Sequence, residues 1–172
     1  MKIIKTKLKD LVIIKKDTHI DNRGYFRELF LEKNFKNKFI FDVMSLSKKN
    51  VLRGLHLQTK KTQGKLITVI KGSLFDVAVD CRKKSKTFGK YFSIKLSEND
   101  NTSLYIPEGF AHGFLTMEAN TEIAYKVSRY YSLEHDVSLL ASSKELNLEL
   151  PIPWETMHLS EKDQSGISIL EI

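Results

Sequence analysis

The sequence predicts a mainly β protein built as an antiparallel sandwich or barrel. Short runs in which apolar and polar residues alternate fill the middle of the chain, and turn-forming residues separate them. Helical patterns are few and lie at the margins. The predicted strands are KLITVI (65–70), SLFDVAVDC (73–81), YFSIKLS (91–97), SLYIP (103–107), HGFLTM (112–117) and TEIAYKVSRYY (121–131).

Length and composition indicate a single folded domain that spans residues 1–172. The chain has 172 residues, of which 41% are hydrophobic, and no repeat or Gly/Ser-rich linker divides it. No apolar run reaches the roughly 20 residues of a membrane helix, and the first residues lack a signal-peptide pattern. We therefore expect a cytoplasmic protein without membrane contact. Cys81, the only cysteine, excludes an internal disulfide and a cysteine-based zinc cluster, and we expect it to be a buried strand residue.

The positive charge of the chain does not form a nucleic-acid binding pattern. The formal net charge is +7, but the lysines are scattered in short pairs and form no basic helix or stripe interleaved with aromatic residues. We expect no nucleic-acid partner. The excess charge would still attract a small anionic ligand.

Two neighbouring runs are expected to form a hairpin with one polar face. Lys71-Gly72 joins 65–70 to 73–81 as a tight turn. In the second run Phe75, Val77 and Val79 share one side, whereas Asp76, Ala78 and Asp80 share the other. A face of carboxylates and small residues is typical of a barrel with a wet interior, and the alternative is a face in contact with solvent. LEKNFKNKF (31–39) has helical spacing, and KELNLEL (144–150) is ambiguous.

The stretch NVLRGLHLQ (50–58) raises the question of function. Arg53 and His56 are three positions apart, so a regular strand would point them to opposite faces. Gly54 lies between them, and a glycine inside a strand is a common bulge site. We predict a bulge that brings both side chains to the same, inner face. The alternative is a surface arginine and a single structural histidine.

Two further residues extend this candidate site. In IPEGFAHGF (106–114) His112 directly precedes a predicted strand, which would place it at the mouth of the barrel. Tyr125 shares a strand face with Ile123 and Val127. Taken alone, His112 fits an ordinary turn and Tyr125 an ordinary core position.

Six ordered blocks together resemble one family, the dTDP-4-dehydrorhamnose 3,5-epimerases. The resemblance runs from about Arg23 to Asp163 and implies a cupin-type jelly-roll barrel that forms a homodimer and uses no metal or redox cofactor. It also implies an isomerase that inverts C3, C5 or both in a nucleotide-diphospho-4-keto-6-deoxy sugar, as a step towards a surface polysaccharide sugar. The blocks are RGYFRELF (23–30), NVLRGLHLQ, QGKLITVIKGSLFDVAVDCRKKSKTFGKY (63–91), LYIPEGFAHGF (104–114), AYKVSRYYS (124–132) and LSEKD (159–163).

The resemblance assigns roles to individual positions. It makes His56 the catalytic base, Asp163 its carboxylate partner and Tyr125 the general acid on the opposite face of the sugar ring. The remaining positions are implied to contact the substrate: Lys65 and His112 around the keto group, Arg53 and Lys162 at the diphosphate or sugar, Asp136 near the lid, and Arg23 and Glu28 at the nucleotide, from the partner subunit.

Elementary chemistry agrees with these residue types. Inverting a carbon next to a ketone needs a base to remove a proton and an acid to return one, with an enolate between the two steps. Histidine, with an unperturbed pKa of about 6.5, suits the first task, and a carboxylate fixes its tautomer. A lysine ammonium stabilises the enolate oxygen, and a phenol, with an unperturbed pKa of about 10, protonates only a strongly basic carbon.

Three departures from the family pattern bear on specificity. Phe41 and Val43 stand where the family carries a Gln and an Asn that read thymine, so a nucleotide other than dTDP, such as GDP, CDP or UDP, is an alternative. ASSK (141–144) replaces a Trp-Asn-Asp-Pro segment, and Asp136 stands where Glu is usual. Trp154, in PIPW, is displaced from the usual Trp-Pro, a change that nothing in the sequence explains.

Three other functions are compatible with this class of fold. A 3,4-ketoisomerase would act on the same substrates, and a non-catalytic barrel would only bind a carbohydrate or nucleotide. A metal cupin needs clustered histidines and a carboxylate, but the sequence contains no closely spaced histidine pair. We therefore expect no metal.

Overall fold

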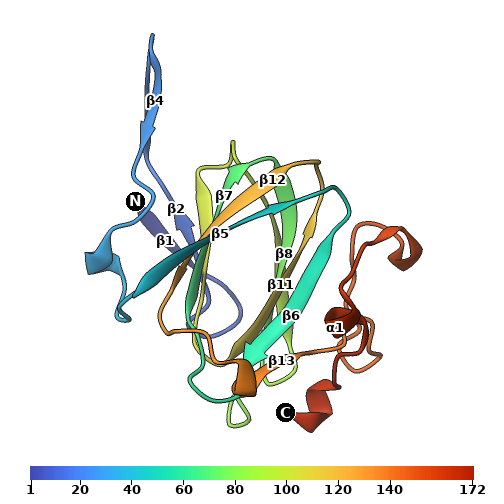
Figure 1. The fold of residues 1–172 in the computed structure, drawn as a ribbon. Helices are drawn as coiled ribbons and strands as arrows, with labels where there is room; N and C mark the ends of the chain where they lie inside the picture. The colour runs from blue at the N-terminus through green and yellow to red at the C-terminus, as the bar shows by residue number, and fades with distance from the viewer.

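The computed structural model describes residues 1–172 as two facing antiparallel sheets, together with a small hairpin (Figure 1). The six-stranded sheet contains, in spatial order, β1 (Lys2–Lys5), β2 (Val12–Lys15), β10 (Thr102–Ile106), β7 (Lys65–Lys71), β12 (Thr121–Val127) and β5 (Phe41–Ser47). The five-stranded sheet contains β13 (Asp136–Ser138), β6 (Leu52–Gln58), β11 (Phe110–Thr116), β8 (Ser73–Asp80) and β9 (Tyr91–Ser97). The predicted mainly β class with antiparallel sheets is confirmed.

The remaining elements lie around the two sheets. The hairpin of β3 (Thr18–Asp21) and β4 (Gly24–Arg27) projects away from the rest of the chain (Figure 1). The helical segments are single turns: η1 (Glu32–Asn34), η2 (Leu133–His135), η3 (Trp154–Thr156), α1 (Glu161–Gln164) and η4 (Ile169–Glu171). No helix is long and apolar enough to cross a bilayer.

The predicted hairpin between residues 65 and 81 is wrong. Both runs are strands, but β7 pairs with β10 and β12, whereas β8 pairs with β11 and β9 in the other sheet. The chain crosses between the sheets at Gly72, which has φ +78°, and a Cβ there would lie 2.7 Å from the Thr121 hydroxyl oxygen. Only glycine adopts this turn without strain, so the Lys71-Gly72 signal marks a corner between two sheets.

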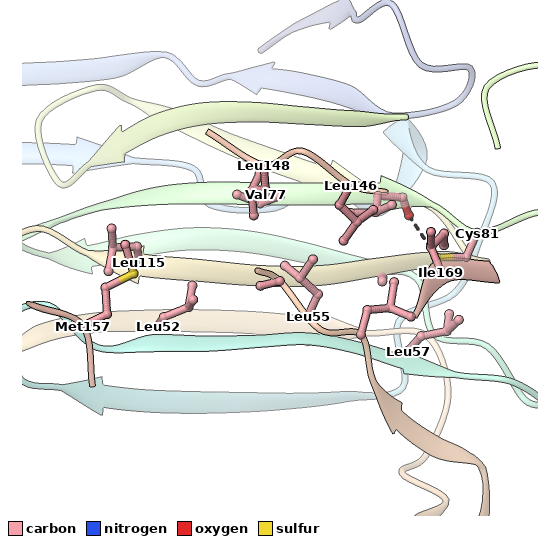
Figure 2. Close-up of a cluster of buried hydrophobic side chains, with 14 residues drawn as sticks. Leu52, Leu55, Leu57, Val77, Cys81, Leu115, Leu146, Leu148, Met157 and Ile169 are labelled. Carbon is pink, nitrogen blue, oxygen red and sulfur yellow. Dashed lines mark hydrogen bonds between the residues drawn. The ribbon is translucent and has the colours of Figure 1, made fainter. Parts of the chain in front are cut away.

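Two apolar cores hold the fold together. The inner core lies between the sheets, where Ile67 and Leu104 of the larger sheet meet Leu74 and Phe114 of the smaller one. The outer core lies on the other face of the five-stranded sheet. There Leu55 and its neighbours pack against Leu146, Leu148, Met157 and Ile169 of the C-terminal segment, which closes over that face (Figure 2). This segment also brings α1 into contact with β6.

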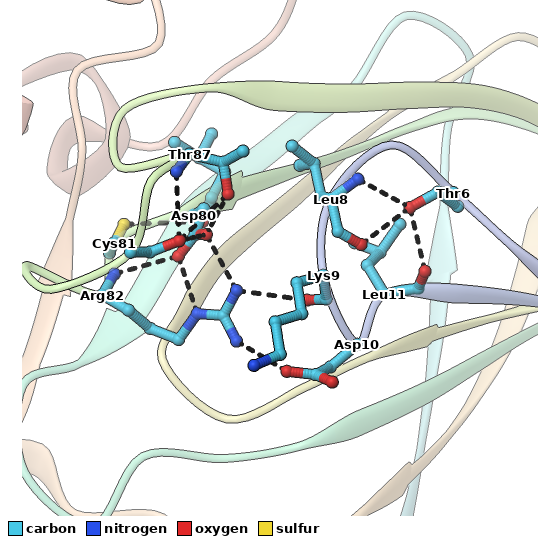
Figure 3. Close-up of polar contacts among 11 residues, drawn as sticks. Thr6, Leu8, Lys9, Asp10, Leu11, Asp80, Cys81, Arg82 and Thr87 are labelled. Atoms are coloured by element: carbon cyan, nitrogen blue, oxygen red, sulfur yellow. Dashed lines mark hydrogen bonds and ion pairs between the residues drawn. The ribbon is translucent and has the colours of Figure 1, made fainter.

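Strand β8 separates the two cores as its alternation predicts, but its polar face is not wet. Val77 and Val79 belong to the outer core, and Ala78 packs in the inner one. Asp80 is fully buried and accepts hydrogen bonds from Arg82, Ser85 and Thr87, which fasten the loop after the strand (Figure 3). Burial alone would raise the pKa of Asp80, but these bonds outweigh it and lower the pKa to about 2.

Arg82 links this loop to the N-terminal part of the chain. Its guanidinium group also binds the Asp10 carboxylate at 3.0 Å and the Lys9 carbonyl at 3.1 Å (Figure 3). The polar face of β8 therefore holds one end of the barrel together at Asp80. Asp76, the other carboxylate of this face, is also fully buried, so the expected wet face of β8 is not present.

The helix predicted over residues 31–39 is reduced to the single turn η1. Its aromatic residues instead form a cluster outside the larger sheet, where Phe35 and Phe39 pack against Tyr105 with ring centroids 5.4 and 6.2 Å apart. Packing of the rings on the sheet overrides the local helical spacing. The ambiguous segment 144–150 forms turns without a helix, and Leu146 and Leu148 face the outer core.

Candidate active site

The bulge predicted at Gly54 is present and shapes the site. On β6 the step from Arg53 to His56 spans three residues, but on the partner strand β11 it spans only the two from Phe114 to His112. Gly54 has φ +103°, and a Cβ there would lie 2.6 Å from the His112 carbonyl oxygen, so no other residue fits. The extra residue turns both Arg53 and His56 towards the same cavity.

Asp163 lies against His56, as the sequence predicts. The His56 Nε2 and Asp163 Oδ1 atoms are 2.7 Å apart, and the Ser138 hydroxyl donates to the same oxygen at 2.7 Å. The Gly54 amide, which the bulge frees from the strand ladder, donates to Asp163 Oδ2 at 3.2 Å. Both carboxylate oxygens are thus engaged, and the second ring nitrogen of His56 remains for a substrate.

The Asp163 carboxylate is held in its charged form. Burial raises its pKa, but the hydrogen bonds from His56, Ser138 and the Gly54 amide outweigh this effect and keep the pKa well below its usual range. The side chain of Asp163 is only 4% exposed, whereas that of His56 is 37% exposed. The pair therefore combines a buried, permanently charged carboxylate with an imidazole that a substrate can reach.

A cavity with two connected chambers surrounds this pair. The polar chamber, of about 560 Å³, runs from His56 along Asp163, Lys162 and Asp136 to His158 and Ser160. The aromatic chamber, of about 390 Å³, extends between the sheets to Tyr125, Phe114 and His112, with Phe41 and Val43 on its wall. The residues shared by both chambers are Arg53, His56, Gln63, Lys65 and Tyr131.

Lys65 is half-buried where the chambers meet. Desolvation lowers the pKa of its ammonium group to about 8, although the negative charges of Asp136 and Asp76 oppose that effect. These two carboxylates are hydrogen-bonded elsewhere, Asp136 to Lys162 and Asp76 to His112. The ammonium group of Lys65 is therefore available to an oxygen of a bound molecule.

Tyr125 is on β12 and lines the aromatic chamber together with His56 and Lys65. Its hydroxyl group is 2.8 Å from the Ser45 hydroxyl of the neighbouring strand β5. Burial raises the Tyr125 pKa to about 12, an effect that the bond to Ser45 opposes. The phenol thus remains protonated over the whole physiological range and can act as an acid.

His112 lies deeper than predicted. The expected position at the barrel mouth is wrong, because β11 begins two residues before His112 and carries the ring inward, where only 4% of the side chain is exposed. Its Nε2 lies 3.1 and 3.0 Å from the two oxygens of Asp76, which is fully buried. Burial lowers the pKa of His112 despite this neighbouring carboxylate.

Asp136 connects three parts of the polar chamber. From β13 it forms an ion pair with Lys162 of α1 and accepts a hydrogen bond of 2.7 Å from the Tyr131 hydroxyl.

Of the two predicted arginines, only Arg53 lines the cavity, and its Nε donates to the Ser47 hydroxyl at 2.9 Å. Within the single chain Arg23 and Glu28 do not line this cavity. Arg23 lies on the projecting hairpin, where it pairs with Asp21.

Several residues of the site are not identified by sequence reasoning. Ser138 and Ser45, which hold Asp163 and Tyr125, carry no local signal because their partners are 25 and 80 positions away in the chain. Asp76 could have been found, since the alternation of β8 places it on the inner face. Tyr131 falls within a quoted block, but only its position between the chambers shows its importance. No group of three or more His, Cys, Asp or Glu side chains is arranged to hold a metal ion.

Comparison with known proteins gives consistent matches over nearly the full chain. The sequence model of the family dTDP-4-dehydrorhamnose 3,5-epimerase matches residues 5–171. A dTDP-4-dehydrorhamnose 3,5-epimerase of Shigella flexneri is 42% identical, over 96% of this chain and 94% of that protein. The enzyme of that name from Methanothermobacter thermautotrophicus is 39% identical, over 95% of this chain and 92% of its own length.

Solved structures agree with the sequence matches. The Legionella pneumophila dTDP-6-deoxy-D-glucose-3,5-epimerase in complex with dTDP-4-keto-L-rhamnose superposes with a TM-score of 0.95 at 39% identity, covering 99% of this chain and 94% of that one. The Elizabethkingia anophelis dTDP-4-dehydrorhamnose 3,5-epimerase gives a TM-score of 0.94 at 39% identity, covering 99% and 97%. The two facing sheets are thus the cupin-type architecture of these epimerases.

Proposed function

Because the chain belongs to the dTDP-4-dehydrorhamnose 3,5-epimerase family, we propose that its cavity enolises a nucleotide-diphospho-4-keto-6-deoxy sugar and inverts C3, C5 or both. The protein is an isomerase. The observation that carries the proposal is the pairing of His56 with the buried Asp163 carboxylate at 2.7 Å, in a chamber that Lys65 and Tyr125 also line.

In this mechanism His56 removes the proton next to the ketone. Its nitrogen bonded to Asp163 is held in one orientation, so the other nitrogen accepts the proton from carbon. The imidazolium that results is stabilised by a carboxylate that stays charged. General-base catalysis of this kind contributes about 10²–10⁴-fold to a rate.

Lys65 stabilises the enolate, and Tyr125 returns a proton to it. As the C–H bond breaks, its electrons form a C=C bond and negative charge moves to the ketone oxygen, where the Lys65 ammonium stabilises it. Tyr125 then donates its phenolic proton to the carbon from the opposite face of the ring, which inverts the centre. The cycle closes when the His56 imidazolium releases its proton to water and the Tyr125 phenolate takes one up from water, so that no net proton is gained or lost. We place His112 beside the keto group, and Arg53, Lys162 and Asp136 along the sugar and diphosphate.

Product analysis in heavy water tests this function. With a 4-keto-6-deoxy sugar nucleotide as substrate, we expect solvent deuterium at the carbons flanking the ketone and a product that differs only in configuration, as read by NMR. A shifted ketone would instead indicate the 3,4-ketoisomerase, and binding without exchange would indicate a non-catalytic barrel.

A Tyr125→Phe variant tests the division of roles. It keeps His56 and Lys65, so we expect proton removal and deuterium exchange to continue while inversion falls by about 100-fold, the lower range of an acid–base contribution. Ser45→Ala is the matched control, since it removes only the hydroxyl that bonds Tyr125. Equal loss of exchange and inversion in Tyr125→Phe would contradict the assignment.

We also propose a homodimer in which each hairpin completes the partner's site. The hairpin projects from its own chain and exposes Tyr25 and Phe26, which are 66% and 68% exposed, and β5 is an unpaired sheet edge (Figure 1). A second copy that packs there would bring Arg23 and Glu28 to the nucleotide. Co-expression of Arg23→Ala with His56→Ala chains should restore partial activity in mixed dimers, and light scattering should give twice the mass of the chain. Activity of a monomer would exclude this arrangement.

Surface polysaccharide synthesis is the process that we propose for the product. A nucleotide-linked substrate and the free, buried Cys81 fit the cytoplasmic location that the sequence predicts, which we retain as part of the proposal.

A further inference from the structure

The carboxylate partner of His56 lies on a very short helix. Asp163 belongs to α1, a single turn in which the Ser160 hydroxyl accepts a hydrogen bond of 3.2 Å from the Asp163 amide. A helix of this length is not stable alone, because one turn of hydrogen bonds does not offset the cost of nucleation. The position of Asp163 therefore depends on the contacts that hold α1 against β6 (Figure 1).

Backbone pairing holds the chain only beyond the two ends of α1. Before the helix, the backbone of His158 pairs with that of Val51, next to β6. After the helix, Ile167 pairs with Leu139. Between these two points every backbone hydrogen bond of residues 159–166 is local to that segment. Side-chain contacts must therefore fix α1 itself.

A hollow of about 400 Å³ borders α1 on the side of the outer core. Asp163 and Leu159 line it, and Trp154 is the largest side chain on its wall. The segment 141–144, which departs from the family pattern, contributes only the small side chains of Ala141 and Ser142. Trp154 is partly buried and also packs against the outer core. Its indole ring is thus the main bulk that limits movement of α1 into this hollow.

On these grounds, and resting on the proposed function, we propose that Trp154 is a positioning residue for the His56–Asp163 pair. The ring supports α1 from the outer core and keeps Asp163 within hydrogen-bond distance of His56. Trp154 lines neither chamber of the cavity, so it acts through Asp163 and does not touch the substrate. This role explains the displaced tryptophan of PIPW, because its indole supplies the bulk that segment 141–144 lacks.

NMR of protein labelled with nitrogen-15 histidine tests the position of Asp163 without the reaction. The nitrogen shifts report which ring nitrogen of His56 carries the proton, and the bond to Asp163 holds that proton on Nε2. We expect Trp154→Ala to give a mixture of His56 tautomers. The His112 ring, which bonds Asp76, is the internal reference and should keep its shifts. Unchanged His56 shifts in Trp154→Ala would overturn the proposal.

The deuterium exchange assay tests the consequence for the reaction. At saturating substrate we expect Trp154→Ala to slow exchange by about 10- to 100-fold, because a small displacement of a reacting group has an effect of this size. Trp154→Phe keeps a ring in the hollow and should restore most of the rate. If Trp154→Ala does not fold, Trp154→Leu removes the ring, keeps apolar volume and should also slow exchange.

Two controls separate positioning from general loss of packing. Leu150→Ala removes another side chain that packs on the outer core but does not line the hollow, so it should lower the melting temperature without slowing exchange. In an Asp163→Asn background, Trp154→Ala should cause no further slowing, because the ring acts through Asp163. Equal slowing in both backgrounds, or equal slowing by Leu150→Ala, would overturn the proposal. Absence of exchange in the unmodified protein would instead refute the proposed function, and the histidine shifts would still decide the role of Trp154.

Discussion

Two histidine–carboxylate pairs lie side by side in this protein and differ in access. His56 and His112 are direct register partners on β6 and β11, and each ring bonds an aspartate within about 3 Å. The side chain of His56 is 37% exposed, but that of His112 is only 4% exposed and its partner Asp76 is fully buried. The same two residue types therefore occur once with solvent contact and once without it.

The difference comes from where each carboxylate originates. Asp76 is on β8, the strand next to β11, so the regular ladder buries the His112–Asp76 pair inside the sheets. Asp163 comes from α1, which approaches β6 at the bulge, where the strand is irregular. The bulge opens the His56–Asp163 pair to a substrate, whereas the His112–Asp76 pair stays buried behind it. The exposed His56–Asp163 pair can therefore exchange a proton with a substrate, whereas the buried His112–Asp76 pair supports the structure of the site.

The largest expected effect is on the exposed pair. We expect His56→Ala to lower the rate of solvent deuterium incorporation by about 10³-fold, within the usual contribution of a general base, with little change in melting temperature. His112→Ala serves as the comparison and should lower the melting temperature, because it leaves the buried Asp76 without its partner. Full exchange in His56→Ala would refute its role as the base.

Lys65, which lies near both pairs, should set the alkaline limit of activity. An ammonium group is charged below its pKa, so kcat/KM should fall above about pH 8, by about tenfold per pH unit, as Lys65 loses its proton. Asp76→Asn removes one of the two carboxylates that raise this pKa and should move the limb to lower pH. The charged and titratable groups around Lys65 are Asp136, Asp76, Lys162, His56 and His112. A pH–rate profile from pH 6 to 10 gives the alkaline pKa of the unmodified protein and of Asp76→Asn. The same alkaline pKa in both proteins would show that Asp76 does not raise the pKa of Lys65.

The buried pair should matter more for stability. Asp76→Ala leaves the His112 ring buried without a hydrogen-bond partner, which costs about 1–3 kcal/mol in the free energy of unfolding. For a chain of this size each kcal/mol lowers the melting temperature by about 2–4 °C. Asp163→Ala is the matched variant. It should lower the melting temperature less, because water can reach the exposed His56 ring. A lower melting temperature for Asp163→Ala than for Asp76→Ala would contradict the view that the buried pair matters more for stability.

The smallest effect is expected at Ser138. Its hydroxyl is one of the donors to Asp163, and Ser138→Ala leaves the bonds from His56 and the Gly54 amide in place. The loss of one such bond is worth about 0.5–1.5 kcal/mol, so we expect exchange to slow by about 2- to 12-fold. Calorimetry measures the stability of Ser138→Ala, and the deuterium assay measures its exchange rate. A loss as large as that of Asp163→Ala would mean that Ser138 has a direct part in the reaction.

The sequence alone determined the local features of this protein. The alternation of β8 assigned its residues to two faces, and Gly54 between Arg53 and His56 marked the bulge. Both features depend on neighbouring residues and on backbone conformations that few residue types adopt, so short-range pattern is sufficient to find them. The resemblance of whole blocks then identified the site residues, which local pattern alone left open.

Only the tertiary structure decided which distant segments meet. Residues 65–81 look like a hairpin locally, yet β7 pairs with β10 and β12 in one sheet and β8 pairs with β11 and β9 in the other. The bond between His56 and Asp163 joins residues 107 positions apart, and it forms because the C-terminal segment buries Leu146, Leu148, Met157 and Ile169 on the outer face of β6 and its neighbours. The free energy of such contacts depends on apolar area buried between segments that are remote in sequence, and no window of the sequence contains both of them.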